Sequence, residues 1–400
     1  MDVFVAGGGV AGLSAGIALA KSGSRVVVAE RAAELREIGA ALSIWPNALA
    51  ALDDLGLGKR VRAVSLEAPT ASVRSTDGKP IVRFDTEAMR RALGGLPVII
   101  LRAGLQAVLL EECDHVGVEV ALGECLEEVR PEGRGVAVTT SRSTRSFDAV
   151  IGADGINSKV GAAIGADSLR DCDRIAWRAL TPNPQGLVAE TWLTVGVGLQ
   201  LIASPAPDDL VYWAADTPGS DMPLDETVDL RSTLSRRFGD WHPPIPHIIG
   251  ATPADALIVN RVYDRRPPGK LHRGPVLLVG DAAHAMTPDL GQGACQAIED
   301  AAVLFALARA NPGSSPVDLF SRFEQVRLPR VRRIVRDSHF FGRLAVAKSS
   351  LGAGARDFLT RLIPENLANR HLASYSSEDA FRRQLVQTCG KLISDTTSQR

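Results

Sequence analysis

The glycine-rich start of the chain constrains its fold more than any other feature. Asp2 to Ala6 forms a short apolar run, and Gly7, Gly9 and Gly12 follow it with the spacing G-x-G-x-x-G before a stretch of helical spacing. In such a strand–turn–helix unit the first glycine permits a tight turn, the second admits a pyrophosphate and the third allows close packing. The free N–H groups and positive dipole of a helix start stabilise phosphate. The sequence therefore predicts a dinucleotide-binding unit.

A second buried strand completes this unit. Arg25 to Ala29 is a continuous apolar run of the kind that parallel sheets require, and Glu30 closes it. An acidic side chain at this place accepts hydrogen bonds from ribose hydroxyls. We expect the dinucleotide to be held by the turn, the helix start and the strand end, namely Gly7, Gly9, Val10, Ala11, Gly12, Glu30 and Arg31.

Two later apolar runs also end in glycine–aspartate turns. Phe147 to Ile151 leads to Asp154-Gly155, and Val276 to Val279 leads to Gly280-Asp281. The second turn could hold a polyol chain through its aspartate. The first could equally be an ordinary turn with no ligand.

A glycine-flanked helix start follows the second of these turns. Gly291, Gln292 and Gly293 stand near the start of an Ala-rich stretch, Leu290 to Ala310, that we predict to be one helix. Backbone N–H groups there would face an acceptor that becomes negative, because a helix start stabilises anionic charge. The alternative is a plain helix cap formed by Asp289.

The order of these patterns predicts an α/β (α+β) fold. Residues 173 to 263 are alternating, proline-interrupted and rich in Trp and Thr, which is typical of an antiparallel sheet. The strand–helix pattern returns near residue 270. We therefore expect a Rossmann-like domain, an antiparallel-sheet substrate domain inserted into it, and a helical C-terminus. Their expected ranges are 1–68, 101–172 and 268–345 for the first, 69–100 and 173–267 for the second, and 346–400 for the third.

Composition excludes several other classes of protein. Lys and Arg total 45 and Asp and Glu total 46, so the chain lacks the basic field of a nucleic-acid binder. The five cysteines are an odd number without a C-x-x-C pair, so we expect neither a disulfide framework nor a metal site. No apolar run reaches the about 18 residues that a membrane span needs, and the start carries no targeting segment. We expect a cytoplasmic protein, a monomer or a homodimer.

The three motifs together resemble the FAD-dependent aromatic hydroxylases of the p-hydroxybenzoate hydroxylase type, the single-component flavoprotein monooxygenases. The resemblance spans roughly residues 1 to 340. It implies that the first glycine motif with Glu30 binds FAD, and that Asp154-Gly155 is linked with FAD and nicotinamide binding. It further implies that Asp281, after Gly280, contacts the ribityl chain of the flavin.

The resemblance also assigns residues around the flavin ring. Arg102 matches an arginine that contacts FAD at the start of a helix, and Pro288 matches a proline over the ring near its reactive C4a carbon. Gly291 to Gly293 match amides near the N1–C2=O edge of the ring. No second G-x-G-x-x-G is present for the nicotinamide, as is usual in this family.

The family reaction would make this chain an oxygen-inserting enzyme. NADPH or NADH would reduce FAD, O2 would add at C4a, and the flavin hydroperoxide would transfer one oxygen atom to a phenolic or heteroaromatic small molecule. Two alternatives stay open. One is an FAD-dependent epoxidase or reductase acting on a terpenoid or polyketide, and the other is a flavin-binding protein without turnover.

The resemblance places the substrate between the flavin ring and the antiparallel sheet. Candidate substrate contacts there are Trp45, Arg178, Trp192, Gln200, Tyr212 and Trp213. Strand alternation sends Tyr212 and Trp213 to opposite faces, so only one of the two can line the pocket. Core packing is the alternative for each candidate.

Four residues are candidates for catalysis: Pro288, Tyr212, Arg178 and His284. Arg178 could pair with an anionic substrate group, and Tyr212 or His284 could deprotonate a phenol. His284 could instead be a structural hydrogen-bonding residue.

One basic run needs a separate interpretation. Arginines recur at 327, 330, 332, 333 and 336 on a predicted helix. Because their charges spread around the helix axis, we interpret them as a solvated face.

Overall fold

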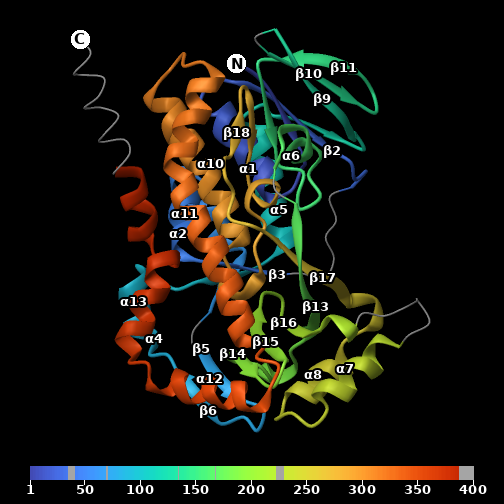
Figure 1. Ribbon diagram of the computed structural model, residues 1–400, viewed down its shortest axis with the longest axis vertical. Helices are drawn as coiled ribbons and strands as arrows, with labels where there is room; N and C mark the ends of the chain where they lie inside the picture. Colours follow the sequence, from blue (N-terminus) through green and yellow to red (C-terminus); the bar gives the residue numbers. More distant parts are fainter. Residues whose placement is uncertain (35–40, 69–70, 134, 167, 222–228, 387–400) are drawn as a thin grey trace.

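The computed structural model describes residues 1–34, 41–68, 71–133, 135–166, 168–221 and 229–386 (Figure 1). Its first layer is a six-stranded sheet in the order β18-β19-β12-β1-β2-β8, parallel except for the antiparallel β18–β19 pair. The strands are β1 (Asp2–Ala6), β2 (Arg25–Glu30), β8 (Glu119–Leu122), β12 (Ala149–Gly152), β18 (His272–Arg273) and β19 (Val276–Leu278). The central strands are apolar and buried along their length because helices and a small sheet cover both faces.

Helices from distant parts of the chain share a hydrophobic core with this sheet. They are α1 (Val10–Ala20), α2 (Pro46–Asp54), α3 (Gly58–Ala63), α5 (Arg102–His115), α6 (Lys159–Ile164), α9 (Asp281–His284), α10 (Gly293–Ala310) and α11 (Pro316–Ala345). Helix α1 packs against both α5 and α10. The first and last thirds of the chain therefore share one hydrophobic core.

Two small antiparallel sheets flank the parallel one. The first has the order β11-β10-β9, and the second has the order β3-β7-β4. Their strands are β3 (Ala41–Ile44), β4 (Ser65–Glu67), β7 (Val98–Leu101), β9 (Leu126–Glu132), β10 (Gly135–Thr140) and β11 (Thr144–Phe147). The strand that we expected from Phe147 to Ile151 is thus divided at Asp148, because Phe147 ends β11 and β12 begins at Ala149.

A seven-stranded sheet forms the second layer, in the lower half of Figure 1. Its order is β17-β13-β16-β15-β14-β5-β6, antiparallel except where β14 pairs with β5. The strands are β5 (Ala71–Ser75), β6 (Pro80–Arg83), β13 (Leu169–Pro182), β14 (Thr191–Val195), β15 (Gln200–Ala206), β16 (Leu210–Pro218) and β17 (Ile258–Arg265). Helices α7 (Leu230–Phe238) and α8 (Ile245–Ala251) cover one of its faces and share a core with it.

Short helices complete the chain. These are α4 (Thr86–Leu93), the 3-10 turns η1 (Pro184–Gly186), η2 (Gly219–Asp221), η3 (Ala254–Ala256) and η4 (Pro288–Leu290), and the C-terminal α12 (Ser350–Leu362) and α13 (Glu365–Ser376). Helix α12 lies beside β6, and α13 packs on α4 and α2. Residues 378–386 are also helical, and the rest of the expected C-terminal segment lies outside the described residues.

The predicted α/β (α+β) fold with parallel and antiparallel sheets and a helical C-terminus is confirmed. One helix boundary differs from the sequence prediction. The helix does not run from Leu290, because Gly291 adopts a left-handed conformation (φ +60°) that ends η4, and α10 begins only at Gly293. No helix among the described residues combines the length and apolar character needed to cross a membrane.

Candidate active site

The glycine turn after β1 leaves open space at one position only. A side chain at Gly7 (φ +104°) would strike the carbonyl of Ala153, and one at Gly12 would strike the carbonyl of Gly7. A Cβ at Gly9 would meet nothing within 4 Å. The first and third glycines are therefore required by the backbone of the protein, whereas the space at the second is available to a ligand.

The start of α1 has no cap from the protein itself. Its N-cap is Gly9, no side chain among the described residues bonds to its first N–H groups, and its first turn, which begins with Val10 and Ala11, carries no acid. These free donors and the open space at Gly9 fit a pyrophosphate. The chain thus offers the cradle that FAD requires.

Glu30 at the end of β2 supports this turn. Its carboxylate accepts hydrogen bonds from the backbone N–H groups of Gly8 (2.7 Å) and Ala32 (2.9 Å). Each oxygen keeps a further lone pair for a ribose hydroxyl. Arg31 follows it and is exposed.

The ends of three parallel strands meet beside α1. Ala153 donates its backbone N–H to Ala6 (2.8 Å), and Val279 donates to Gly152 (3.0 Å). A Cβ at Gly280 would come within 2.6 Å of the Ala11 side chain. The turn before Asp281 therefore lies against the start of α1, and Asp281 itself is exposed there.

The Asp154 carboxylate is hydrogen-bonded within the protein. Its carboxylate accepts hydrogen bonds from the backbone N–H groups of Lys159 (2.7 Å) and Val160 (3.1 Å) and from the Ser158 hydroxyl. It stabilises the start of α6, which is the alternative that the sequence left open. Gly155 follows it, with no atom within 4 Å of a Cβ built there.

Helix α5 supplies one group that sequence reasoning missed. Arg102, its first residue, is half-buried. One turn later, the buried Gln106 directs its amide nitrogen toward the Gly8 carbonyl (3.5 Å), and its amide oxygen has no partner among the described residues. The i, i+4 spacing from Arg102 was the available signal, because it puts both side chains on one helix face.

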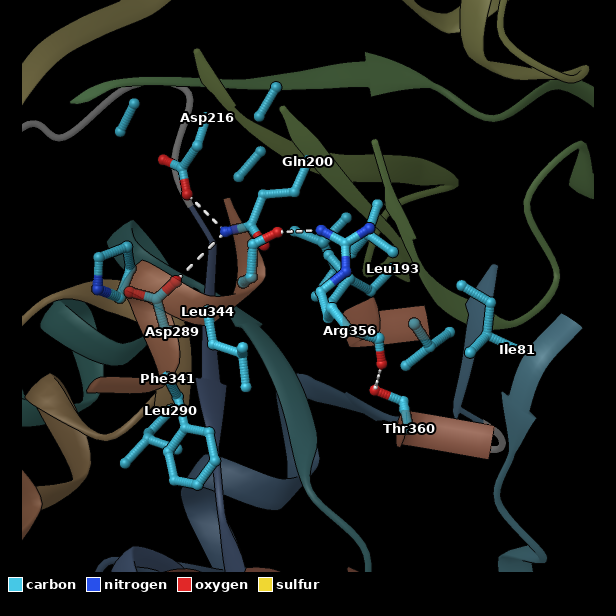
Figure 2. Close-up of a pocket in the computed structure, with 18 of the residues that line it drawn as sticks. Ile81, Leu193, Gln200, Asp216, Asp289, Leu290, Phe341, Leu344, Arg356 and Thr360 are labelled. Atoms are coloured by element: carbon cyan, nitrogen blue, oxygen red, sulfur yellow. Dashed lines mark hydrogen bonds between the residues drawn. The ribbon is translucent and has the colours of Figure 1, made fainter. Parts of the chain in front are cut away.

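A cavity of about 440 Å³ opens between the seven-stranded sheet and η4 (Figure 2). Pro288, Arg178, Gln200 and Tyr212 all line it. The last three come from strands β13, β15 and β16 and Pro288 comes from η4, so the fold brings them together around one cavity.

Trp213 and Trp192 do not line this cavity. Both are buried in the core between the sheet and α7–α8, where the indole N–H of Trp213 donates to the Thr252 hydroxyl (3.0 Å). The physical reason is strand alternation: Tyr212 points to the cavity face of β16, and Trp213 to the helix-covered face.

Trp45 also lies outside the cavity. Its indole nitrogen would be 2.9 Å from a Cβ on Gly291, and it has no hydrogen-bond partner among the described residues. Trp45 therefore packs on the loop that precedes α10.

The cavity wall includes a charged cluster that the sequence did not indicate. Arg174 donates to Asp289 (2.7 Å) and to Asp216 (3.3 Å), and the Gln200 amide donates to the same two carboxylates (2.5 Å to Asp216, 3.3 Å to Asp289). Burial raises the pKa of Asp216, while the charge of Arg174 opposes the rise. No spacing could reveal this cluster, since its members lie on β13, β15, β16 and η4.

His284 does not line the cavity. It is buried, and its Nε2 lies 2.8 Å from the Asp300 carboxylate, which also accepts the Gly280 backbone N–H (2.9 Å). Burial alone would raise the pKa of Asp300, but His284 and Arg327 outweigh it, and the pKa lies below its usual value. The cluster fixes the turn before Asp281.

The prediction that the arginines of α11 form a solvated face is wrong for two of them. Arg327 is fully buried and contacts both Glu299 (2.6 Å) and Asp300 (2.7 Å). Arg330 binds Glu299 as well and donates to the Tyr375 carbonyl (2.7 Å). Charge periodicity missed them because their acidic partners stand on another helix, α10.

One group of potential metal ligands exists among the described residues. Cys172, Asp264 and His339 bring one ligand atom each within 4.8 Å of one another. However, Arg170 already binds both carboxylate oxygens of Asp264, and burial raises the pKa of the Cys172 thiol to about 12. An ion-pair cluster explains these contacts without a metal.

Comparisons with known proteins identify the family of the chain. The model of the FAD binding domain family matches residues 1–192 and 263–338. The aurachin C monooxygenase/isomerase of Stigmatella aurantiaca is 32% identical over 371 residues, which cover 91% of this chain and 94% of that protein. The FAD-dependent urate hydroxylase of Klebsiella pneumoniae is 32% identical over 343 residues, 84% of this chain and 88% of that protein.

A solved structure has the same architecture. HpxO of Klebsiella pneumoniae, complexed with FAD and uric acid, superposes with a TM-score of 0.84 at 28% identity, over 94% of this chain and 96% of that chain. The chain therefore belongs to the FAD binding domain family. It is an FAD-dependent oxidoreductase of the monooxygenase (hydroxylase) type.

Proposed function

We propose that this protein uses NADPH or NADH and O2 to insert one oxygen atom into a phenolic or heteroaromatic small molecule. The observation that carries this proposal is the cavity lined by both Pro288 and the sheet residues Arg178 and Tyr212. It adjoins the loop that precedes α10, where the family resemblance puts the flavin ring. The urate hydroxylase relative and the uric acid complex of HpxO support a heteroaromatic substrate.

We propose that FAD is held by residues from all three motif segments. They are Gly7, Gly9, Val10, Ala11, Gly12, Glu30, Arg31, Arg102, Asp154, Gly155, Gly280, Asp281, Pro288, Gly291, Gln292 and Gly293. Asp154 would act through its turn, since its carboxylate caps α6. Gln292 would act through its backbone, because its side chain is buried and bonds to Ser376 (3.0 Å). When bound, FAD supplies the electron transfer and oxygen activation that amino-acid side chains lack.

The cavity residues would bind and orient the substrate. Arg178 has no hydrogen-bond or ion-pair partner among the described residues, so its guanidinium is available to an acceptor on the substrate ring. Burial raises the pKa of Tyr212. Its phenol therefore stays protonated at neutral pH and donates a hydrogen bond, which replaces the role of base that the sequence suggested.

We further propose the domain division set out from the sequence, with residues 1–68, 101–172 and 268–345 binding FAD. Residues 69–100 and 173–267 would bind the substrate, and the helices after 345 would support both. A monomer or homodimer would suffice, because every proposed contact comes from one chain.

The proposal is tested by turnover of the FAD-loaded protein with isotopically labelled O2. NAD(P)H oxidation and O2 uptake should rise together when a suitable phenol or N-heteroaromatic compound is added, and the product should carry one labelled oxygen atom. Transfer of hydride to a C=C bond without label would instead indicate the reductase alternative. Labelled epoxide from an alkene would indicate the epoxidase.

A further inference from the structure

The cavity has two chemically different ends. At the end nearest Pro288 it is polar, with Arg178, Gln200, Asp216 and Asp289 in its wall. Away from this end its wall is apolar, and we define the apolar arm as Val73, Ile81, Phe84 and Leu193. Figure 2 shows Asp216 and Gln200 on one side of the cavity and Ile81 on the opposite side.

Several elements build the apolar arm. One wall comes from β5, β6 and β14 at the edge of the seven-stranded sheet, and the other from α12, which contributes Thr360. Arg356 on α12 also lines it, but its guanidinium pairs with Asp357 (2.8 Å) and donates to the Gly196 carbonyl (3.1 Å). The charge of Arg356 is therefore matched within the protein, and the arm favours an uncharged apolar group.

The polar end is balanced in charge. Arg174 and Arg178 stand with Asp216 and Asp289, and Arg174 bridges both carboxylates. A substrate carboxylate would add an unmatched negative charge beside two buried acids, which is costly. An uncharged carbonyl or hydroxyl that accepts a hydrogen bond from Arg178 fits this end better.

We propose that the substrate is an uncharged aromatic or heteroaromatic ring that carries an aliphatic chain. The ring lies at the polar end beside Pro288, and the chain fills the apolar arm between β6 and α12. This inference rests on the proposed function and specifies its substrate. Burial of the chain supplies binding free energy through the hydrophobic effect, and the polar end sets the orientation of the ring.

The test measures ligand binding to the FAD-loaded protein without turnover, from the change in flavin absorbance. The probes are 4-quinolone and its 2-alkyl derivatives from methyl to nonyl, together with 4-hydroxybenzoate as a charged ring. We expect Kd to fall by up to about fourfold for each methylene group that enters the arm, until the arm is full. The carboxylate probe should bind more weakly than the uncharged ring.

A matched pair of variants locates the chain. Thr360→Trp adds bulk on the α12 side of the arm at a residue that is only half-buried, so the fold tolerates it. Leu351→Trp is its control, because Leu351 on the same helix is 89% exposed and does not line the cavity. Thr360→Trp should abolish the gain from long chains and leave the binding of the unsubstituted ring unchanged, whereas Leu351→Trp should behave as wild type. Ile81→Trp should repeat the effect from the opposite wall.

A Kd independent of chain length, or equal effects of Thr360→Trp and Leu351→Trp, would overturn the inference. These outcomes are separate from failure of the proposed function. Hydroxylation of a ring without any effect of chain length would leave the function standing and refute the apolar arm as a chain site. Binding that depends on chain length without any oxygenated product would support the apolar arm as a chain site and refute the proposed function.

Discussion

Two glycines of the same turn have different physical roles, which can be separated by single substitutions. Gly12→Ala puts a methyl group against the Gly7 carbonyl, so it should destabilise the protein even without FAD, by about 1–3 kcal/mol or more. Gly9→Ala meets no protein atom and should change the stability of the apoprotein by less than about 0.5 kcal/mol. It should nevertheless raise the Kd of FAD, since the methyl group occupies the space proposed for the pyrophosphate. Thermal unfolding of apoprotein and FAD titration measure the two effects, and equal losses of stability would contradict this assignment.

The Asp300 carboxylate gives a prediction for pH dependence. Its pKa is lowered in the folded protein, so its ionisation stabilises the fold above the unfolded pKa of about 3.9, and this contribution is lost as pH falls through the folded pKa. Asp300→Asn should cost about 3–5 kcal/mol at pH 7, because it removes one of the two carboxylates paired with the buried Arg327 and the carboxylate that contacts His284. The difference in Tm from wild type should shrink below about pH 4.

Asp53→Asn is the control for this experiment. Its carboxylate pairs with Arg62 at the surface, where an ion pair contributes only about 0–1 kcal/mol. A difference between wild type and Asp300→Asn that persisted unchanged at acid pH would show that charge is not the cause.

At the scale of an element, strand β16 divides its side chains between core and cavity. Trp213→Ala should cost about 3–5 kcal/mol of unfolding free energy, since the side chain is fully buried against α7–α8. Tyr212→Phe on the opposite face should leave stability within about 1 kcal/mol and lower kcat/KM by roughly tenfold, because it removes a hydrogen-bond donor from the cavity. Denaturant titration and steady-state kinetics distinguish the two. Loss of stability in Tyr212→Phe with unchanged kinetics would contradict the division.

At the scale of the whole molecule, buried polar contacts join α10 and the loop before it, where we propose that the flavin binds, to the C-terminal helices. Arg330 on α11 contacts Glu299 on α10 and the Tyr375 carbonyl on α13, and the Gln292 side chain bonds to Ser376. The helices after α11 are therefore expected to affect flavin binding although they carry no motif.

Arg330→Leu tests this connection. It should expose the segment after residue 345 to limited proteolysis and weaken FAD binding, with a cost of about 3–5 kcal/mol for breaking a buried ion pair. Arg336→Leu on the same helix is the control, since Arg336 is exposed and, within the described part of the chain, its ion pair is with its neighbour Asp337. Proteolysis rates and FAD titration measure the outcome, and an equal response of both variants would refute the connection.

The sequence by itself determined the parts that local chemistry fixes. The G-x-G-x-x-G turn, the buried strand to Glu30 and the alternation in β16 follow from steric limits, helix ends and strand geometry, which act over a few residues. Only the tertiary structure decided the parts that depend on contact between distant segments. These include the Arg174–Asp216–Asp289 cluster, the burial of Arg327 and His284, the placing of Trp192 and Trp213 in the core, and the apolar arm. The reason is that burial and ion pairing depend on which elements pack together. The periodicity of residues along one helix or strand does not show which residue on another element will contact it.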